Sequence, residues 1–273
     1  MNVGEVKEML SLNEVAERLG LHYMTVYKYV RSGKLPGHKN DGSWEVAEKD
    51  LSSLSELEPA PPGRGHRALG KRSGLFLQAI VAGDQPGSWS IINGALESGA
   101  SVEDVICEVV VPALRSVGDE WAHGRLQIFE EHRATSIVIA SLGRMQGLPQ
   151  RRGRKRGTVL IACPPNETHG LPAAICAELI RSRGFNPFNL GADNPIETII
   201  NAASSTDELV AVILSTVSST PQKVVVDSVE MLTKGLPGTP IMVGGVWPEL
   251  PDSVLSINGF PSMLDQLEEL SAS

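Results

Sequence analysis

The sequence is poor in cysteine, in aromatic residues and in long apolar runs. Its 3 cysteines lie far apart and form no Cys-x-x-Cys pair, which excludes a disulfide framework and a cysteine-built zinc site. Aromatic residues make up 4% of the chain, too few for a function that depends on broad stacking surfaces. No apolar stretch approaches the ~20 residues that a membrane-spanning helix needs, and the first residues carry acids without an apolar signal core. We therefore expect a cytoplasmic protein with no membrane partner.

An excess of positive charge is also absent. The formal net charge of −8 excludes a uniformly basic nucleic-acid coat, although it allows a small local DNA-reading module. Hydrophobic residues make up 41% and charged residues 21% of the 273 positions, which is ordinary for globular domains and argues against general disorder. This length is sufficient for two or three compact units.

Composition divides the chain into three folded segments. Residues 55–71 combine proline, glycine and charge without an apolar period, which predicts a linker. Residues 147–157 form a short basic segment with glycine at both ends, either a solvated hinge or a stretch that touches DNA. We expect a first domain over residues 1–54, a helical domain over 72–148 and a third domain over 157–273.

The middle segment has apolar residues at spacings of three and four, which predicts four helices. Ser101 and Asp104 fit a capping box at the start of one of them. Glycines that can end a helix follow three of these stretches: Gly83, Gly99 and Gly124. Four helices with short connections predict a small four-helix bundle.

The last segment has a different period. Short β-branched runs at 158–163, 209–215 and 240–245 alternate with helical stretches around 170–183, 195–204 and 221–234. Continuous apolar strands separated by helices predict a parallel sheet covered on both faces. We therefore expect a doubly wound, Rossmann-like α/β domain, whose ligand binds at the carboxyl ends of the strands.

The first segment predicts two short helices that meet at Gly20, followed by a β-hairpin with its turn at residues 40–42. The expected buried face consists of Val15, Ala16, Leu19, Leu21, Val26 and Val30. The order of these elements, the SGKLP stretch and Trp44 resemble the excisionase and MerR-type winged helix-turn-helix. The alternative is a small helical protein-interaction domain.

The winged helix-turn-helix resemblance implies that one helix enters the major groove while the wing contacts phosphates. The side chains expected to contact a double-stranded DNA operator are Tyr23, Thr25, Lys28, Arg31 and Lys39. Residues 1–54 carry seven Lys/Arg against eight Asp/Glu, so one copy should bind weakly. Tight binding then requires several copies side by side, which makes the oligomeric state a natural point of control.

A loop at the carboxyl edge of the expected sheet contains Glu167 and His169. A single histidine in a loop is more often a solvated side chain than a ligand. However, 42 residues separate Pro172 from Ser215, and 26 residues separate Val217 from Gly244 and Gly245. This series resembles the cobalamin-binding signature E/D-x-H-x-x-G, S-x-L and G-G, with Pro172 in place of glycine and Val217 in place of leucine.

That resemblance implies that His169 is the lower axial ligand of cobalt and that Glu167 accepts the other imidazole N–H. It also implies that Ser215 extends this network. The remaining expected cofactor contacts are Gly170, Val217, Gly244 and Gly245, the last two because glycine lets the tail of the cofactor pass close to the backbone. Pro172 restricts the residue before it, so we expect it to reshape the loop. Trp247 either packs on the tail or belongs to the core.

In the helical segment, Trp121 precedes Glu131 and His132 with nine intervening residues. Alone, this pattern fits a core tryptophan followed by a polar helix face as well as it fits a cofactor-binding motif. Ahead of a cobalamin signature, it resembles light-sensing repressors of the carotenoid-regulator type, which bind adenosylcobalamin. The resemblance implies that Trp121 packs over the adenosyl group and that Glu131 and His132 hydrogen-bond to it.

Some members of that family are thought to use a histidine directly after this tryptophan as the upper cobalt ligand in the light. Here that position is Ala122, which leaves His123 and His132 as candidates.

The resemblance therefore identifies the chain as a member of the cobalamin-dependent, light-sensing transcriptional regulators of the MerR/carotenoid-repressor type. It implies a non-enzymatic homo-oligomer, a tetramer in the dark, that binds DNA when filled with adenosylcobalamin and is released by light. Three alternatives remain: a sensor of another tetrapyrrole such as a bilin or haem, a corrinoid methyl-carrier protein, and a cofactor-free DNA-binding scaffold.

Overall fold

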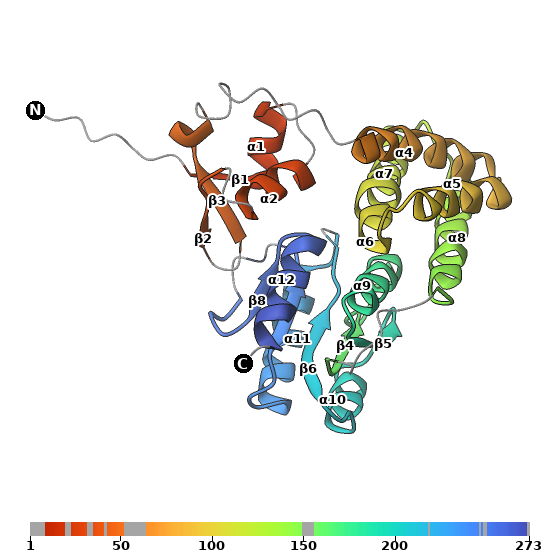
Figure 1. The fold of residues 1–273 in the computed structure, drawn as a ribbon. Helices are drawn as coiled ribbons and strands as arrows, with labels where there is room; N and C mark the ends of the chain where they lie inside the picture. The colour runs from red at the N-terminus through yellow and green to blue at the C-terminus, as the bar shows by residue number, and fades with distance from the viewer. Residues whose placement is uncertain are drawn as a thin grey trace, which may run out of the picture. The chain divides into compact units, whose positions relative to one another are not determined.

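The structure is a computed structural model that forms two compact units, Met1–Ala68 and Leu69–Ser273 (Figure 1). The residues it describes are 9–19, 23–31, 35–40, 43–51, 64–148, 156–217, 219–245, 247 and 250–271. Among the described helices, none combines the length and the apolar character that a membrane crossing requires.

The first unit is a small α/β module with an antiparallel sheet. Its elements are β1 (Met9–Ser11), α1 (Leu12–Leu19), α2 (Tyr23–Arg31), β2 (His38–Asn40), β3 (Ser43–Ala47) and a 3-10 turn (Glu48–Leu51). The sheet order is β1-β3-β2, and Asn40 pairs with Ser43. This pairing confirms the hairpin, although its turn residues 41–42 lie outside the described residues. Strand β1 was not expected, since three residues are too few to show a period.

The core of this unit holds the two helices against the sheet. Helix α1 begins with a capping box, in which the Ser11 backbone N–H donates to Glu14 (2.7 Å) and the Glu14 N–H donates to the Ser11 hydroxyl (3.3 Å). Four of the residues expected in the core are buried: Val15, Ala16, Val26 and Val30. The side chains of the other two, Leu19 and Leu21, lie outside the described residues.

The second unit begins with the predicted helices. They are α4 (Arg64–Ala82), α5 (Gln85–Glu97), a continuous rod of α6 (Val102–Val105), a π-helical turn (Ile106–Val110) and α7 (Val111–Ala122), and finally α8 (Ile128–Met145). The capping box of Ser101 and Asp104 is confirmed. Positive φ angles of 83°, 92° and 71° confirm the glycine stops at Gly83, Gly99 and Gly124. Helix α4 starts at Arg64, inside the segment expected to be a linker.

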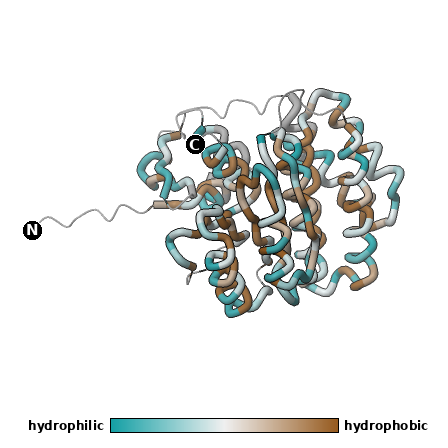
Figure 2. Tube along the Cα trace, turned by 90° about the horizontal axis from the view of Figure 1, so that it is seen from below, coloured by the Kyte–Doolittle hydropathy of each residue, from teal (hydrophilic) through white to brown (hydrophobic). Residues whose placement is uncertain are grey.

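A five-stranded sheet completes this unit. Its elements are β4 (Thr158–Ala162), α9 (Leu171–Ser182), β5 (Asn186–Gly191), α10 (Ile196–Ser204), β6 (Leu209–Leu214), α11 (Gln222–Gly235), β7 (Ile241–Gly244), β8 (Leu255–Ile257) and α12 (Phe260–Leu270). All neighbouring strands are parallel, in the order β5-β4-β6-β7-β8, which confirms a doubly wound fold. Helices α9 and α12 contact each other, as do α10 and α11. Hydrophobic residues gather on the central strands (Figure 2).

One arginine links the helical segment to the α/β fold. Arg183, directly after α9, donates two hydrogen bonds to Glu103 of α6, from Nε (2.7 Å) and Nη2 (2.9 Å). It donates a third from Nη1 to Glu268 of α12 (2.6 Å). The side chains of this cluster are mostly buried, so the two-pronged ion pair is shielded from water and contributes more than a surface pair.

We expect Glu103→Gln to lower the free energy of unfolding by about 1–2 kcal/mol, because it removes one partner of a charged, two-pronged hydrogen bond. Urea unfolding followed by circular dichroism measures this change. The matched control is Lys223→Gln, which breaks the exposed pair with Asp227 and should change stability by less than about 0.5 kcal/mol. Equal effects of the two variants would show that Arg183 adds nothing beyond a surface pair.

Candidate functional site

The loop between β4 and α9 lies at the carboxyl edge of the sheet. It carries Glu167 and His169, and α9 begins at Leu171 with Gly170 as its N-cap. Pro172 therefore lies in the first turn of α9, where its missing N–H has no hydrogen bond to lose and its fixed φ suits the helix. Helix α9 therefore accommodates Pro172, and its effect on the loop and on the cofactor stays a prediction.

Glu167 and His169 form a closely bonded pair. Oε1 of Glu167 accepts the backbone N–H of His169 at 2.8 Å and lies 2.6 Å from Nδ1 of the His169 ring. The Glu167 side chain is 2% exposed, whereas the His169 side chain is 61% exposed. The pair thus has a buried carboxylate behind an imidazole that faces outward.

The charge of Glu167 sets the tautomer of His169. Burial raises the pKa of Glu167, but hydrogen bonds from Thr220 and from His169 outweigh it, so the net pKa is lowered. An ionised carboxylate is a pure acceptor, so Nδ1 must carry the proton of this hydrogen bond. In the neutral imidazole, Nε2 then presents a lone pair, as a metal ligand requires.

The network behind Glu167 differs from the sequence expectation. Oε2 of Glu167 accepts a hydrogen bond from the hydroxyl of Thr220. Among the described residues, no hydrogen bond joins Ser215 to Glu167. Burial raises the pKa of the Cys163 thiol to about 11, and a hydrogen bond with the Ser215 side chain opposes that shift. Thr220 is therefore a hydrogen-bond partner of Glu167 that the sequence did not predict, and Ser215 as a cofactor contact stays a prediction.

The loop after β5 supports the His169 loop from the side. The Asp193 carboxylate accepts the Asn166 N–H (2.8 Å), and the Asp193 N–H donates to the Glu167 carbonyl (2.9 Å). The Asn194 N–H donates to the Cys163 carbonyl at 3.1 Å. Asn166 and Asp193 both have positive φ, at 65° and 54°. Sequence reasoning missed this support, because it did not predict strand β5, after which these polar residues lie.

The glycine pair lies at the end of β7. The Gly244 carbonyl accepts hydrogen bonds from the Thr216 hydroxyl (2.6 Å) and from Nε1 of Trp247 (2.7 Å). Gly245 has φ +88°, and a Cβ there would lie 3.2 Å from Nε1 of Trp247. Trp247 also packs against the core beneath the sheet, which favours the core alternative for this residue.

The residues expected to cap the cofactor lie on α7 and α8. Trp121, near the end of α7, is 51% exposed, so the core alternative does not hold for it. Glu131 accepts a hydrogen bond from Thr135 (2.9 Å) and lies 3.5 Å from Nε2 of the exposed His132. Ile128 and Phe129 are exposed as well, each at 63%. Within the described part of the chain, no hydrogen bond joins Trp121, Glu131 or His132 to the His169 loop.

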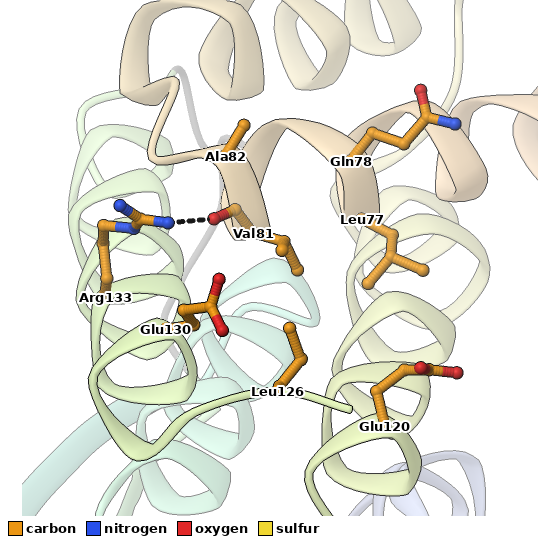
Figure 3. Close-up of a pocket in the computed structure, with 8 residues that line it drawn as sticks. All are labelled: Leu77, Gln78, Val81, Ala82, Glu120, Leu126, Glu130 and Arg133. Atoms are coloured by element: carbon orange, nitrogen blue, oxygen red, sulfur yellow. Dashed lines mark hydrogen bonds between the residues drawn. The ribbon is translucent and has the colours of Figure 1, made fainter. Parts of the chain in front are cut away.

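A pocket of about 480 Å³ lies beside these residues, between α4, α7 and α8 (Figure 3). None of the expected site residues lines it. Its walls are Leu77, Gln78, Val81, Ala82, Glu120, Leu126, Glu130 and Arg133. Each charged side chain already has a partner: Arg133 donates to the Val81 carbonyl, Glu120 accepts from Arg125, and Glu130 accepts the Gln127 N–H.

Comparison with known proteins identifies the family. A helix-turn-helix domain model matches residues 9–54, and a B12 binding domain model matches residues 75–146. The HTH-type transcriptional repressor CarH of Myxococcus xanthus is 32% identical over 210 residues, which cover 73% of this chain and 68% of that protein. The chain belongs to the CarH family. It is a transcriptional regulator with a helix-turn-helix and a B12-binding domain, which confirms the resemblance stated from the sequence.

The fold of this CarH-family regulator also matches a solved structure. The monomethylamine corrinoid protein of Methanosarcina barkeri is 15% identical, with a TM-score of 0.55, over 71% of this chain and 96% of that one. At this identity the match shows the fold alone, a helical segment followed by a parallel α/β sheet.

The residues expected to contact DNA are only partly described. Arg31, at the end of α2, and Lys39, in the wing strand β2, are exposed. The side chains of Tyr23, Thr25 and Lys28 lie outside the described residues, although their backbone belongs to α2.

We expect Glu167→Gln to lower the free energy of unfolding by about 2 kcal/mol at neutral pH, because it removes a buried, fully bonded charge. The pKa of Glu167 is lowered from its ordinary value of 4.5. The stabilisation is therefore complete above that value and is lost as the pH falls through the lowered pKa. The difference between wild type and variant should shrink below pH 4.5 in urea unfolding measured across pH.

The matched control for this pH series is Glu197→Gln, at an exposed position in the first turn of α10. Its effect should stay within about 0.5 kcal/mol. A difference between wild type and Glu167→Gln that stays constant on acidification would contradict the assigned charge.

Proposed function

We propose that this CarH-family regulator is a photoreceptor that binds adenosylcobalamin and, in the dark, binds a double-stranded DNA operator as a homo-oligomer, a tetramer. Visible light releases the protein from DNA. The observation that carries the proposal is the Glu167–His169 pair, in which a buried carboxylate leaves Nε2 of an exposed imidazole ready to bind a metal.

The residues of the α/β fold suit the lower face of a cobalamin. His169 would bind cobalt through Nε2, while Glu167 holds the ring and the tautomer. Gly170, which has no side chain, is next to the ligand at the start of α9. The further expected contacts come from the loops that follow β6 and β7: Ser215, Val217, Gly244 and Gly245. Adenosylcobalamin supplies a cobalt–carbon bond that visible light cleaves.

The helical segment suits the upper face. Trp121, Glu131 and His132 are exposed or half-buried and lie on the consecutive helices α7 and α8, so they are accessible to a ligand that covers them. We assign Trp121 to the adenosyl group and Glu131 and His132 to hydrogen bonds with it. In the light, Ala122 offers no ligand. His123, whose Nδ1 donates to the Asp119 carbonyl (2.7 Å), and His132 are the candidates.

The chain then divides into functional parts. Residues 1–54 read DNA, residues 72–148 cap the cofactor and residues 157–273 bind it, in a protein of the cytoplasm. A near-neutral DNA module binds weakly as one copy, so assembly supplies the avidity and disassembly removes it. Light acts only if the cofactor has different affinities for two arrangements of cap and α/β fold.

Size-exclusion chromatography with in-line absorbance tests the proposal on protein loaded with adenosylcobalamin in the dark. Corrin absorbance should elute with a large species, and green light should shift the protein to a smaller one. The affinity of His169→Ala for the corrin should be at least about tenfold lower, because the variant lacks the proposed metal ligand. Co-elution without a change in size would disprove release by disassembly. The absence of bound corrin would disprove the proposal that the protein binds adenosylcobalamin.

DNA binding is tested by Lys39→Gln. If the wing contacts phosphates, the variant should weaken binding to all sequences and reduce the slope of log K against log salt by about 1. Titration of the dark, cofactor-loaded protein on operator DNA at several salt concentrations measures this slope. Lys234→Gln, at an exposed position at the end of α11, is the control and should leave the slope unchanged.

A further inference from the structure

Thr220 is not part of the cobalamin signature, but the structure places it in contact with a residue that is. It is 6% exposed and lies between β6 and α11, directly before Pro221, the N-cap of α11. Its backbone N–H donates to the Val217 carbonyl (2.9 Å), and its hydroxyl accepts the Val217 N–H (3.0 Å). Two reciprocal hydrogen bonds therefore hold the Thr220 side chain in one orientation.

The direction of the bond to Glu167 follows from these contacts. A threonine hydroxyl has one proton to donate, and the Val217 N–H already occupies one of its lone pairs. The Glu167 carboxylate accepts only, so the Thr220 hydroxyl donates its one hydrogen bond to Oε2. With Oε2 held in this way, Oε1 is left to face the N–H and Nδ1 of His169.

Movement of the carboxylate away from this position would leave a buried hydroxyl without its acceptor, which is unfavourable. The loop after β6 thus fixes a carboxylate on the loop after β4, and that carboxylate fixes the imidazole.

We propose that Thr220, rather than Ser215, is the positioning residue that holds Glu167 in place and thereby sets the Nδ1–H tautomer of His169. The consequence for cobalt ligation rests on the proposed function, whereas the tautomer is a property of the chain alone. Among the described residues, Oε2 of Glu167 accepts from Thr220, and no hydrogen bond joins Ser215 to Glu167.

The first readout is the tautomer in the full-length, cofactor-free protein, measured by ¹⁵N NMR of the imidazole nitrogens. Wild type should show Nδ1–H at His169. Thr220→Val, which keeps the shape of the side chain and removes the hydroxyl, should give a mixture of tautomers. If the valine variant does not fold, Thr220→Ala replaces it and should give the same mixture. Thr220→Ser keeps the hydroxyl and should restore the wild-type spectrum.

The second readout is affinity for adenosylcobalamin in the dark, which should fall about tenfold or more in Thr220→Val and recover in Thr220→Ser. The matched control is Thr206→Val, which removes a threonine hydroxyl bonded to the Ala202 carbonyl after α10, at the opposite edge of the sheet.

An unchanged tautomer in Thr220→Val, or the same mixture of tautomers in cofactor-free Ser215→Ala, would overturn the assignment. Failure of wild type to bind corrin would instead overturn the proposed function, while the tautomer still decides the role of Thr220.

Discussion

The site depends on one constraint, that a buried carboxylate must have its lone pairs satisfied. An unpaired charge in the interior is strongly unfavourable, so Glu167 is stable at 2% exposure only because hydroxyl, imidazole and backbone donors converge on it. The same contacts determine the orientation of the His169 ring, the proposed metal ligand. His169 is held by a bond that fixes which nitrogen carries the proton, and Nε2 is the one that remains for a metal.

The topology of the sheet brings these donors together. Strands β4 and β6 are hydrogen-bonded neighbours in the order β5-β4-β6-β7-β8, and both are parallel. The loops that follow them therefore meet at one edge, which places Thr220 on Glu167 although 53 positions separate them in the sequence. The loop after β5 completes the support from the other side of β4, through Asp193 and Asn194. A CarH-family site of this kind thus follows from the strand order as much as from the signature.

The sequence predicted a hydrogen bond between Glu167 and His169 because the two residues are only two positions apart, and the structure contains that bond. It did not locate Thr220, since its hydrogen bond depends on the turn it makes with Val217, which residue types alone do not specify. It also missed the strands β5 and β8. The first carries asparagine, proline and glycine in place of a β-branched run, and the second has only three residues. The sequence also did not predict that α4 begins as early as Arg64. Its first residues are rich in glycine and charge, which is typical of a linker, and helix formation there depends on tertiary contacts.

Helix α9 connects the two parts that the proposed light response must coordinate. It begins next to His169 and ends at Ser182, directly before Arg183, whose guanidinium donates hydrogen bonds to Glu103 and Glu268. A ligand that binds two arrangements equally shifts neither, so the proposed switch needs contacts that differ between them. The junction at Arg183 is fully bonded and has little to gain from a ligand. Trp121 and His132 remain largely exposed in the described structure, so the contacts that distinguish the two arrangements must come from their end of the helical segment.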